Sequence, residues 1–180
     1  MKRIIDVDPN YRYNADFYRE DMHFYDVRKE PFSVHGLLWE NDGYCRMPEE
    51  TAKKVNAGVH QLSRNTAGGR IRFTTDSLYV GLSCKMPNIT RFPHMPMTGV
   101  SGFDLSADGV YYRSFIQPLE MEHGYDCRID FPERKMREIE IRFPLYNDVS
   151  EVQIALQKSA ALEPARPYKY QRPVVFYGSS

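Results

Sequence analysis

The cysteines, the charge balance and the apolar runs of the sequence do not indicate a metal ion, a polyanion or a membrane as partner. It contains three cysteines, Cys45, Cys84 and Cys127, and no two of them have the close spacing of a zinc-binding pair. Its 24 basic and 24 acidic side chains cancel, which argues against a nucleic-acid partner. No apolar run approaches the length of a membrane span. We therefore expect no metal, no other cofactor, no nucleic acid and no membrane span.

A signal peptide is also missing, because the first residues contain no continuous apolar segment of the required length. We expect a cytoplasmic protein if Met1 is the native start and an exported one if a leader preceded it. Residues 1–21 lack a clear period and are interpreted as an N-terminal arm. Its four aromatic residues, Tyr11, Tyr13, Phe17 and Tyr18, predict that the arm packs against the main body.

Helical patterns are scarce, and alternation with a period of two dominates. Residues 125–131, 139–143 and 152–156 alternate apolar and polar side chains, which is typical of antiparallel strands with one wet face. Further strands are predicted at 32–39, 70–74, 78–84 and 110–115, with a turn at 40–43. One short helix is predicted at 48–55, where Pro48 precedes two acidic residues. This pattern predicts an all-β domain over residues 22–157, a β-sandwich of jelly-roll type.

The composition changes after Leu156. Residues 158–173 are interpreted as a proline-containing linker, since Pro164, Pro167 and Pro173 stiffen them. Residues 174–177 are apolar in succession, which predicts a strand buried on both sides as in a parallel sheet. The Gly-Ser-Ser that follows is typical of a flexible tail, but after a buried strand it is also how α/β hydrolases present a nucleophile. Residues 174–180 are therefore interpreted as the first strand of an α/β domain.

Five short segments stand in the same order as in one known type of domain that precedes a hydrolase domain. Residues 44–48 resemble the Arg-x-Pro entry of that domain, and residues 65–77 resemble its Thr-Ala-Gly-Gly-Arg strand pair. Residues 102–105 are similar to its Gly-x-Asp-Leu-Tyr signature, with Ser106 in place of the tyrosine. Residues 143–147 resemble a further segment, and residues 177–180 resemble the opening of the hydrolase's first sequence block. The chain thus resembles the N-terminal, GxDLY-type β-sandwich domain of bacterial SGNH (GDSL-type) hydrolases, truncated at the start of the catalytic domain.

The resemblance implies a role for the last serine of the chain. Ser180 would be the nucleophile of a parent serine esterase, whose oxyanion glycine, asparagine and Asp-x-x-His would all lie downstream. A serine without a general base is a poor nucleophile at neutral pH, so this chain alone is expected to be inactive. Its expected partner is the downstream catalytic domain of the same protein.

A second group of residues is predicted to bind substrate. Residues 87–101 form a loop long enough to wall a neighbouring pocket, and His94 and Met95 lie on it, near Asp104. Asp104 has another interpretation, as an acceptor of backbone hydrogen bonds in the turn at 107–109. The sequence therefore predicts a non-catalytic accessory domain that shapes or assists substrate access.

The alternative function is a carbohydrate-binding module that brings the parent enzyme to a glycan. Trp39 and Tyr112 are its candidate stacking residues, although core and sheet packing explain such aromatics equally well. The ligand would be a carbohydrate or an acyl ester.

Overall fold

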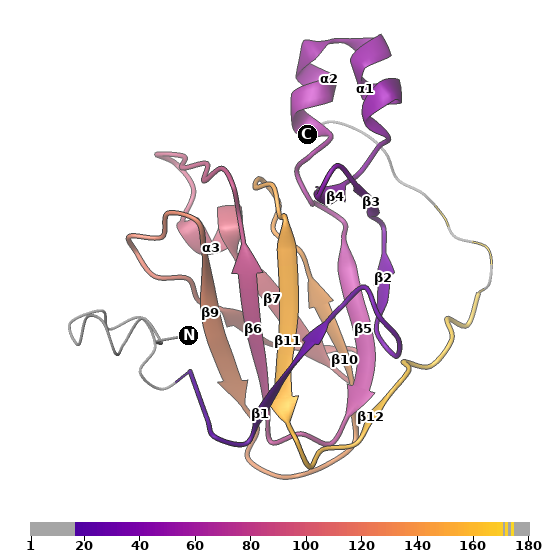
Figure 1. The fold of residues 1–180 in the computed structure, drawn as a ribbon, viewed down its shortest axis with the longest axis vertical. Coiled ribbons are helices and arrows are strands. Elements are labelled where there is room, and N and C mark those ends of the chain that lie inside the picture. Colours follow the sequence, from indigo (N-terminus) through magenta and orange to yellow (C-terminus); the bar gives the residue numbers. More distant parts are fainter. Residues whose placement is uncertain (1–16, 171, 173, 175–180) are drawn as a thin grey trace.

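The structure is a sandwich of two antiparallel β-sheets (Figure 1). The computed structural model describes residues 17–170, 172 and 174. The strands are β1 (Met22–Asp26), β2 (Ser33–His35), β3 (Leu38–Glu40), β4 (Gly43–Cys45), β5 (Arg70–Thr75), β6 (Tyr79–Lys85), β7 (Phe103–Ala107), β8 (Val110–Phe115), β9 (Gly124–Asp130), β10 (Arg137–Arg142), β11 (Glu151–Gln157) and β12 (Leu162–Glu163). The helices are α1 (Glu49–Val55), α2 (Ala57–Leu62) and α3 (Met97–Ser101). The predicted all-β sandwich is confirmed.

The strand order places distant parts of the chain side by side. The smaller sheet has the order β1-β11-β6-β9, and the larger sheet has the order β12-β5-β10-β7-β8, with β2 also paired to β5. A separate β3–β4 ribbon and the α1–α2 pair stand at one end of the sandwich, which is the end where α3 also lies (Figure 1). We call this end the cleft end, for the cleft described below.

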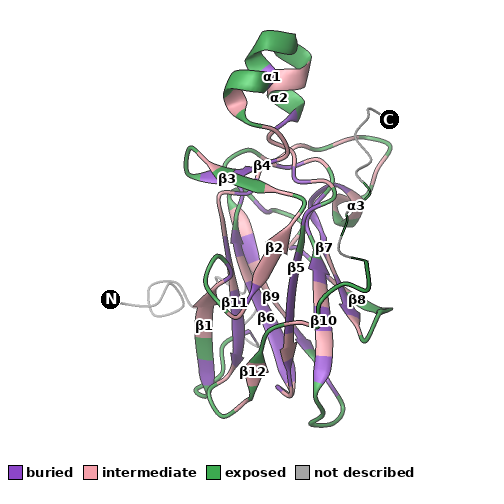
Figure 2. Ribbon diagram, turned by 90° about the vertical axis from the view of Figure 1, so that its right-hand side faces the viewer, coloured by how far each residue is buried: buried purple, intermediate pink, exposed green. Residues whose placement is uncertain are grey.

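One hydrophobic core fills the space between the sheets (Figure 2). The alternation predicted over residues 125–156 is confirmed, because each of the three strands turns its apolar side chains inward. The buried members are Tyr125, Ile129 and Phe131 from the β9 segment, Ile139, Ile141 and Phe143 from the β10 segment, and Val152, Ile154 and Leu156 from β11. Burial of such side chains is the main favourable term for a sandwich of this kind.

The strand predicted at 32–39 is divided into β2 and β3. Gly36 lies between them with a φ of 80°, and a Cβ on it would lie 2.6 Å from the carbonyl oxygen of Gly68. The chain turns here because glycine alone tolerates that conformation and that close approach. The strand-like composition of residues 32–39 thus hid a turn that separates two short strands.

The helix predicted at 48–55 is confirmed as α1, but it is not the only one. Asn56 caps α2, since its Oδ1 accepts a hydrogen bond from the backbone N–H of Val59 at 2.9 Å. The prediction of a single helix was wrong because α2 buries none of its residues and α3 has only five residues. Helix α2 therefore has no buried apolar stripe, and α3 is too short for a periodic pattern to reveal it.

Strand β1 was not predicted, and the reason lies on the outer face of the smaller sheet. Phe17 is 1% exposed and packs there against Met22, Tyr79 and Ala155. Met22 and Phe24 pack on this outer face and Tyr25 packs against the core between the sheets, so apolar side chains stand on both faces of β1 and its sequence shows no regular alternation. Tyr11 and Tyr13 of the predicted arm lie outside the described residues.

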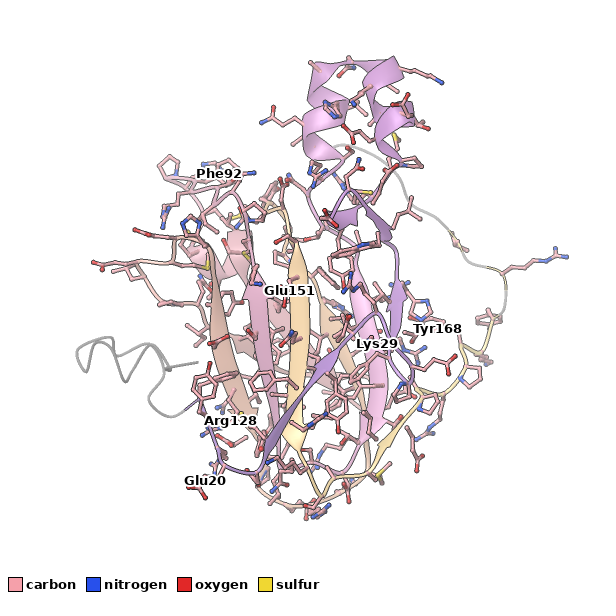
Figure 3. All side chains as sticks on the ribbon, in the orientation of Figure 1. Glu20, Lys29, Phe92, Arg128, Glu151 and Tyr168 are labelled. Carbon is pink, nitrogen blue, oxygen red and sulfur yellow. The ribbon has the colours of Figure 1, made fainter. Side chains whose placement is uncertain are left out.

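The segment after β11 runs along the larger sheet. We call residues 161–168 the strap. The strap runs antiparallel to β5, from Thr75 at the end of β5 toward Arg70 at its start. Leu162 lies opposite Thr75 in β12, and Tyr168 places its ring over Arg72 and near Arg70 (Figure 3). The strap therefore carries the chain toward the cleft end. The predicted strand at 174–177 is described only at Val174, which is exposed.

Candidate functional site

A cleft of about 330 Å³ lies where three separate segments meet at the end of the larger sheet. Its walls come from residues 68–70 before and at the start of β5, residues 98–104 of α3 and β7, and residues 142–145 at the end of β10. The sheet register explains the meeting, because the start of β5 and the start of β7 both flank the end of β10.

Charged side chains form a row across this end of the sheet. Arg70 lies opposite Arg142, and Arg142 lies opposite Asp104. The Nε of Arg142 donates to Glu140 Oε1 at 3.1 Å, and Asp104 accepts a hydrogen bond from Ser114 Oγ at 2.6 Å. Neighbours on the sheet hold Arg142 and Asp104 in place, which suits the recognition of a polar partner.

The expected role of Asp104 in the turn at 107–109 is wrong. Asp108 occupies that turn with a φ of 52°, and its carboxylate accepts the backbone N–H of Glu138 at 2.9 Å. Asp104 lies near the other end of β7, on the outer face of the strand, with Ser114 as its partner. The neighbouring turn therefore does not need Asp104, whose side chain contributes to the cleft.

Glycines let the backbones approach one another at the cleft. A Cβ on Gly102 would lie 2.3 Å from the carbonyl oxygen of Thr98, and one on Gly69 would lie 2.2 Å from Leu37 Cδ1. Gly102 also donates its N–H to the carbonyl oxygen of Thr98 at 3.1 Å. A larger residue at position 102 must displace the Thr98 backbone in the cleft wall, and one at position 69 must displace the Leu37 side chain.

Asn147 ties the same segments together beneath the surface. Its Oδ1 accepts the backbone N–H of Thr90 at 2.8 Å, and its side-chain amide donates to Ser101 Oγ. Thr66 Oγ1 donates to the carbonyl oxygens of Pro144 and Asn147 at 3.1 and 3.2 Å. Asn147 and Thr66 are fully buried, so their role is to fix the loops that line the cleft.

A serine and a histidine also meet, on β2, but their surroundings do not suit catalysis. His35 Nε2 lies 3.2 Å from Ser33 Oγ. Burial, and then the charges of Arg72 and Arg70, lower the pKa of His35, with Glu140 opposing them. A general base must become an imidazolium, and these neighbours disfavour that cation. The pair is therefore a structural contact.

The loop with His94 and Met95 lies at the cleft end, as Figure 3 shows for its neighbour Phe92. His94 is exposed, and its ring centroid lies 5.5 Å from that of Phe92. Met95 packs over α3, where its Cγ lies 3.3 Å from the position of a Cβ on Gly99. The structure thus brings Met95 beside the helix that walls the cleft, while His94 lies farther out on the loop.

The two predicted stacking residues do not share a surface. Trp39 on β3 is 40% exposed, and the Arg28 guanidinium covers its ring at 4.2 Å from the centroid, held there by Asp26. Tyr112 on β8 is 38% exposed, and its hydroxyl donates to the carbonyl oxygen of Asp130 at 3.3 Å. They belong to different sheets, and Figure 2 shows β3 and β8 on separate parts of the molecule.

The described part of the chain also bears on the predicted nucleophile, on metal binding and on membrane spans. Ser180 lies outside it. Within it, no group of three His, Cys, Asp or Glu residues is placed to hold a metal ion. No described helix is long and apolar enough to cross a membrane.

A family comparison gives the context of the cleft. The sequence profile of GxDLY, the N-terminus of the SGNH-hydrolase type of esterase, matches residues 22–162. The chain belongs to the GxDLY family. All three walls of the cleft lie within the matched residues, and one of them holds the Gly102-Phe103-Asp104-Leu105 segment. Ser106, in place of the GxDLY tyrosine, is buried beside an irregularity in the β7–β8 pairing and lies opposite Tyr111.

Solved structures share the fold of this GxDLY chain. A putative GDSL-like lipase from Bacteroides ovatus superposes with a TM-score of 0.69 at 18% identity, covering 81% of this chain and 43% of the other. A salicylyl-acyltransferase from a tetracycline biosynthetic pathway gives 0.64 at 19% identity, covering 84% and 44%. A family two carbohydrate esterase from Cellvibrio japonicus gives 0.51 at 15% identity, covering 84% and 37%.

The chain spans less than half the length of each of these proteins. No curated protein matched the chain.

Proposed function

We propose that this GxDLY domain is the non-catalytic accessory part of an SGNH-type esterase, and that its cleft end docks on the catalytic domain and shapes access to the catalytic serine. The observation that carries the proposal is the course of the strap, which leads the chain to the cleft end. There Tyr168 contacts His35 and Arg72 and lies near Arg70 of the cleft. Ser180, by its family pattern, is the nucleophile of the parent enzyme in this proposal.

Two further features support docking at this end. Leu145 is 48% exposed on the cleft wall, where an apolar side chain gains by contact with another surface. The loop at 87–101 projects from the same end and carries His94 and Met95 (Figure 1). A catalytic domain seated on the cleft would meet both.

The proposal is tested by joining the chain to the downstream domain and comparing a bulky ester with a small acetate ester. The chain alone should hydrolyse neither. In the joined protein, Leu145→Glu should lower kcat/KM for the bulky ester by roughly tenfold. The substitution places a charge on the surface that, in this proposal, docks on the catalytic domain or walls its substrate pocket. Met136→Glu is the matched control, because Met136 is also exposed but directly precedes β10, at the end of that strand away from the cleft.

The loop residues give a second arm of the same experiment. His94→Ala or Met95→Ala should affect the bulky ester more than the acetate ester, because a pocket wall matters most for a large substrate. Equal losses for both esters, or equal effects of Leu145→Glu and Met136→Glu, would contradict the proposal.

The glycan-binding alternative makes a different prediction. The isolated chain would bind acetylated oligosaccharides in a calorimetric titration, and Trp39→Ala or Tyr112→Ala would abolish that binding. The geometry favours it less, because Arg28 already occupies one face of Trp39. The accessory function predicts no measurable binding in this titration.

We also infer that the sandwich is a jelly roll. Strands β1, β11, β6 and β9 face strands β5, β10, β7 and β8. Numbered one to eight in chain order, they stand as 1-8-3-6 and 2-7-4-5, which is the order produced when a folded strand pair wraps around a sandwich.

A further inference from the structure

The strap is fastened to β5 by side chains rather than by a continuous ladder of main-chain hydrogen bonds. The ladder of β12 ends at Glu163, and Pro164 and Pro167 follow, which have no N–H to donate. Side chains of β5 add hydrogen bonds on either side of this short ladder. Thr75 Oγ1 donates to the carbonyl oxygen of Ala161 at 2.6 Å, and Thr74 Oγ1 donates to that of Pro164 at 3.3 Å.

Arg72 makes the largest set of these contacts. Its Nη2 donates to Glu138 Oε1 at 2.8 Å and to the carbonyl oxygen of Arg166 at 3.0 Å. The ring of Tyr168 covers its guanidinium at 3.9 Å from the centroid. Glu138 completes the set, because its Oε2 accepts the backbone N–H of Arg166 at 3.1 Å.

Burial makes these contacts mutually dependent. The Arg72 side chain is 7% exposed although it lies on the outer face of the sheet, so the strap supplies its cover. Without the strap, Arg72 would lose a hydrogen-bond acceptor, which destabilises a buried charged group. Without Arg72, the strap would lose the donor that binds the carbonyl oxygen of Arg166. The two are therefore stable only together.

We propose that the strap is a fixed latch with Arg72 as its positioning residue, and that the latch sets the place at which the chain leaves the sandwich. The exit lies beside His35 and Arg70, next to the cleft. The latch is a property of this chain by itself. Its consequence, a catalytic domain delivered to the cleft in one orientation, rests on the proposed function.

Hydrogen exchange of the strap amides tests the latch in the chain as it stands. Arg72→Met keeps the aliphatic stem but removes the donors, and should raise exchange in residues 161–168 at least tenfold. Arg142→Met is the matched control, because Arg142 is an exposed arginine on the same sheet face whose side chain bonds to Glu140. It should leave strap exchange unchanged. The β6 and β11 amides should stay protected in both variants.

A second variant keeps the test decisive if Arg72→Met fails to fold. Tyr168→Ala removes an exposed ring that no strand depends on, and should also loosen the strap. Unchanged strap exchange in folded Arg72→Met, or in Tyr168→Ala, would overturn the latch whatever the enzymology shows. A loosened strap with unchanged ester turnover in the joined protein would uphold the latch and count against the proposed function.

Discussion

At the scale of single residues, the glycines of the cleft offer a direct test of how tightly its walls are packed. Gly102 and Gly99 lie close together in sequence, but their surroundings differ. A Cβ on Gly102 would meet the Thr98 carbonyl oxygen at 2.3 Å, whereas one on Gly99 would meet the flexible Met95 side chain at 3.3 Å. Backbone cannot move aside as a methionine can.

We therefore expect Gly102→Ala to lower the free energy of unfolding by about 2 kcal/mol, the size of an overpacking penalty. Gly99→Ala should be close to neutral, because the helix preference of alanine over glycine, up to about 1 kcal/mol, offsets the close contact with the Met95 side chain. Urea unfolding followed by circular dichroism measures both. Equal midpoints for the two variants would show that the end of α3 can move away from residue 102.

At the scale of elements, the segment before β1 stabilises the smaller sheet from outside. Phe17 is buried on that sheet, while its neighbour Tyr18 is 56% exposed although the two rings lie 5.0 Å apart. Phe17→Ala should cost about 3 kcal/mol of unfolding free energy, as for other buried phenylalanines. Tyr18→Ala should cost less than about 1 kcal/mol. Similar losses for both would mean that Phe17 does not anchor the segment.

The elements also show which parts of the fold were predictable. Strands β9, β10 and β11 were predicted because each has one wet face, so alternation marks them. Strand β1 was not, because Phe17 covers its outer face and removes the polar half of the pattern. The close approach of Gly36 to Gly68 divides β2 from β3, and no local pattern shows a contact between segments so distant in sequence.

The cleft was predictable only in its parts. Asp104 was a candidate from its segment, but Arg70 and Arg142 were not, since no spacing in sequence signals a row that the strand register alone creates. Arg72 was missed for a similar reason. An arginine at an outward strand position is usually a solvated charge, and only the return of the strap buries it.

At the scale of the whole molecule, one core joins every sheet, including the outlying β3–β4 ribbon. Tyr44 of β4 belongs to that core and lies 5.0 Å from the ring of Phe143. The ribbon also carries Trp39, the single tryptophan of the chain. Its fluorescence therefore reports on the edge of the structure, while far-UV circular dichroism reports on the sheets.

Because Tyr44 ties the ribbon to the core, we expect the two signals to change together in urea, with the same midpoint and slope, as in two-state unfolding. Tyr44→Ala should separate them, since it removes the contact while Arg28 still covers Trp39. Arg28→Ala is the control, because it changes the surroundings of Trp39 without touching the core, and the midpoints should stay together. If fluorescence changes at lower urea than circular dichroism in the unaltered chain, the β3–β4 ribbon unfolds before the sheets. The ribbon would then be an independently unfolding part and not a fixed neighbour of the cleft.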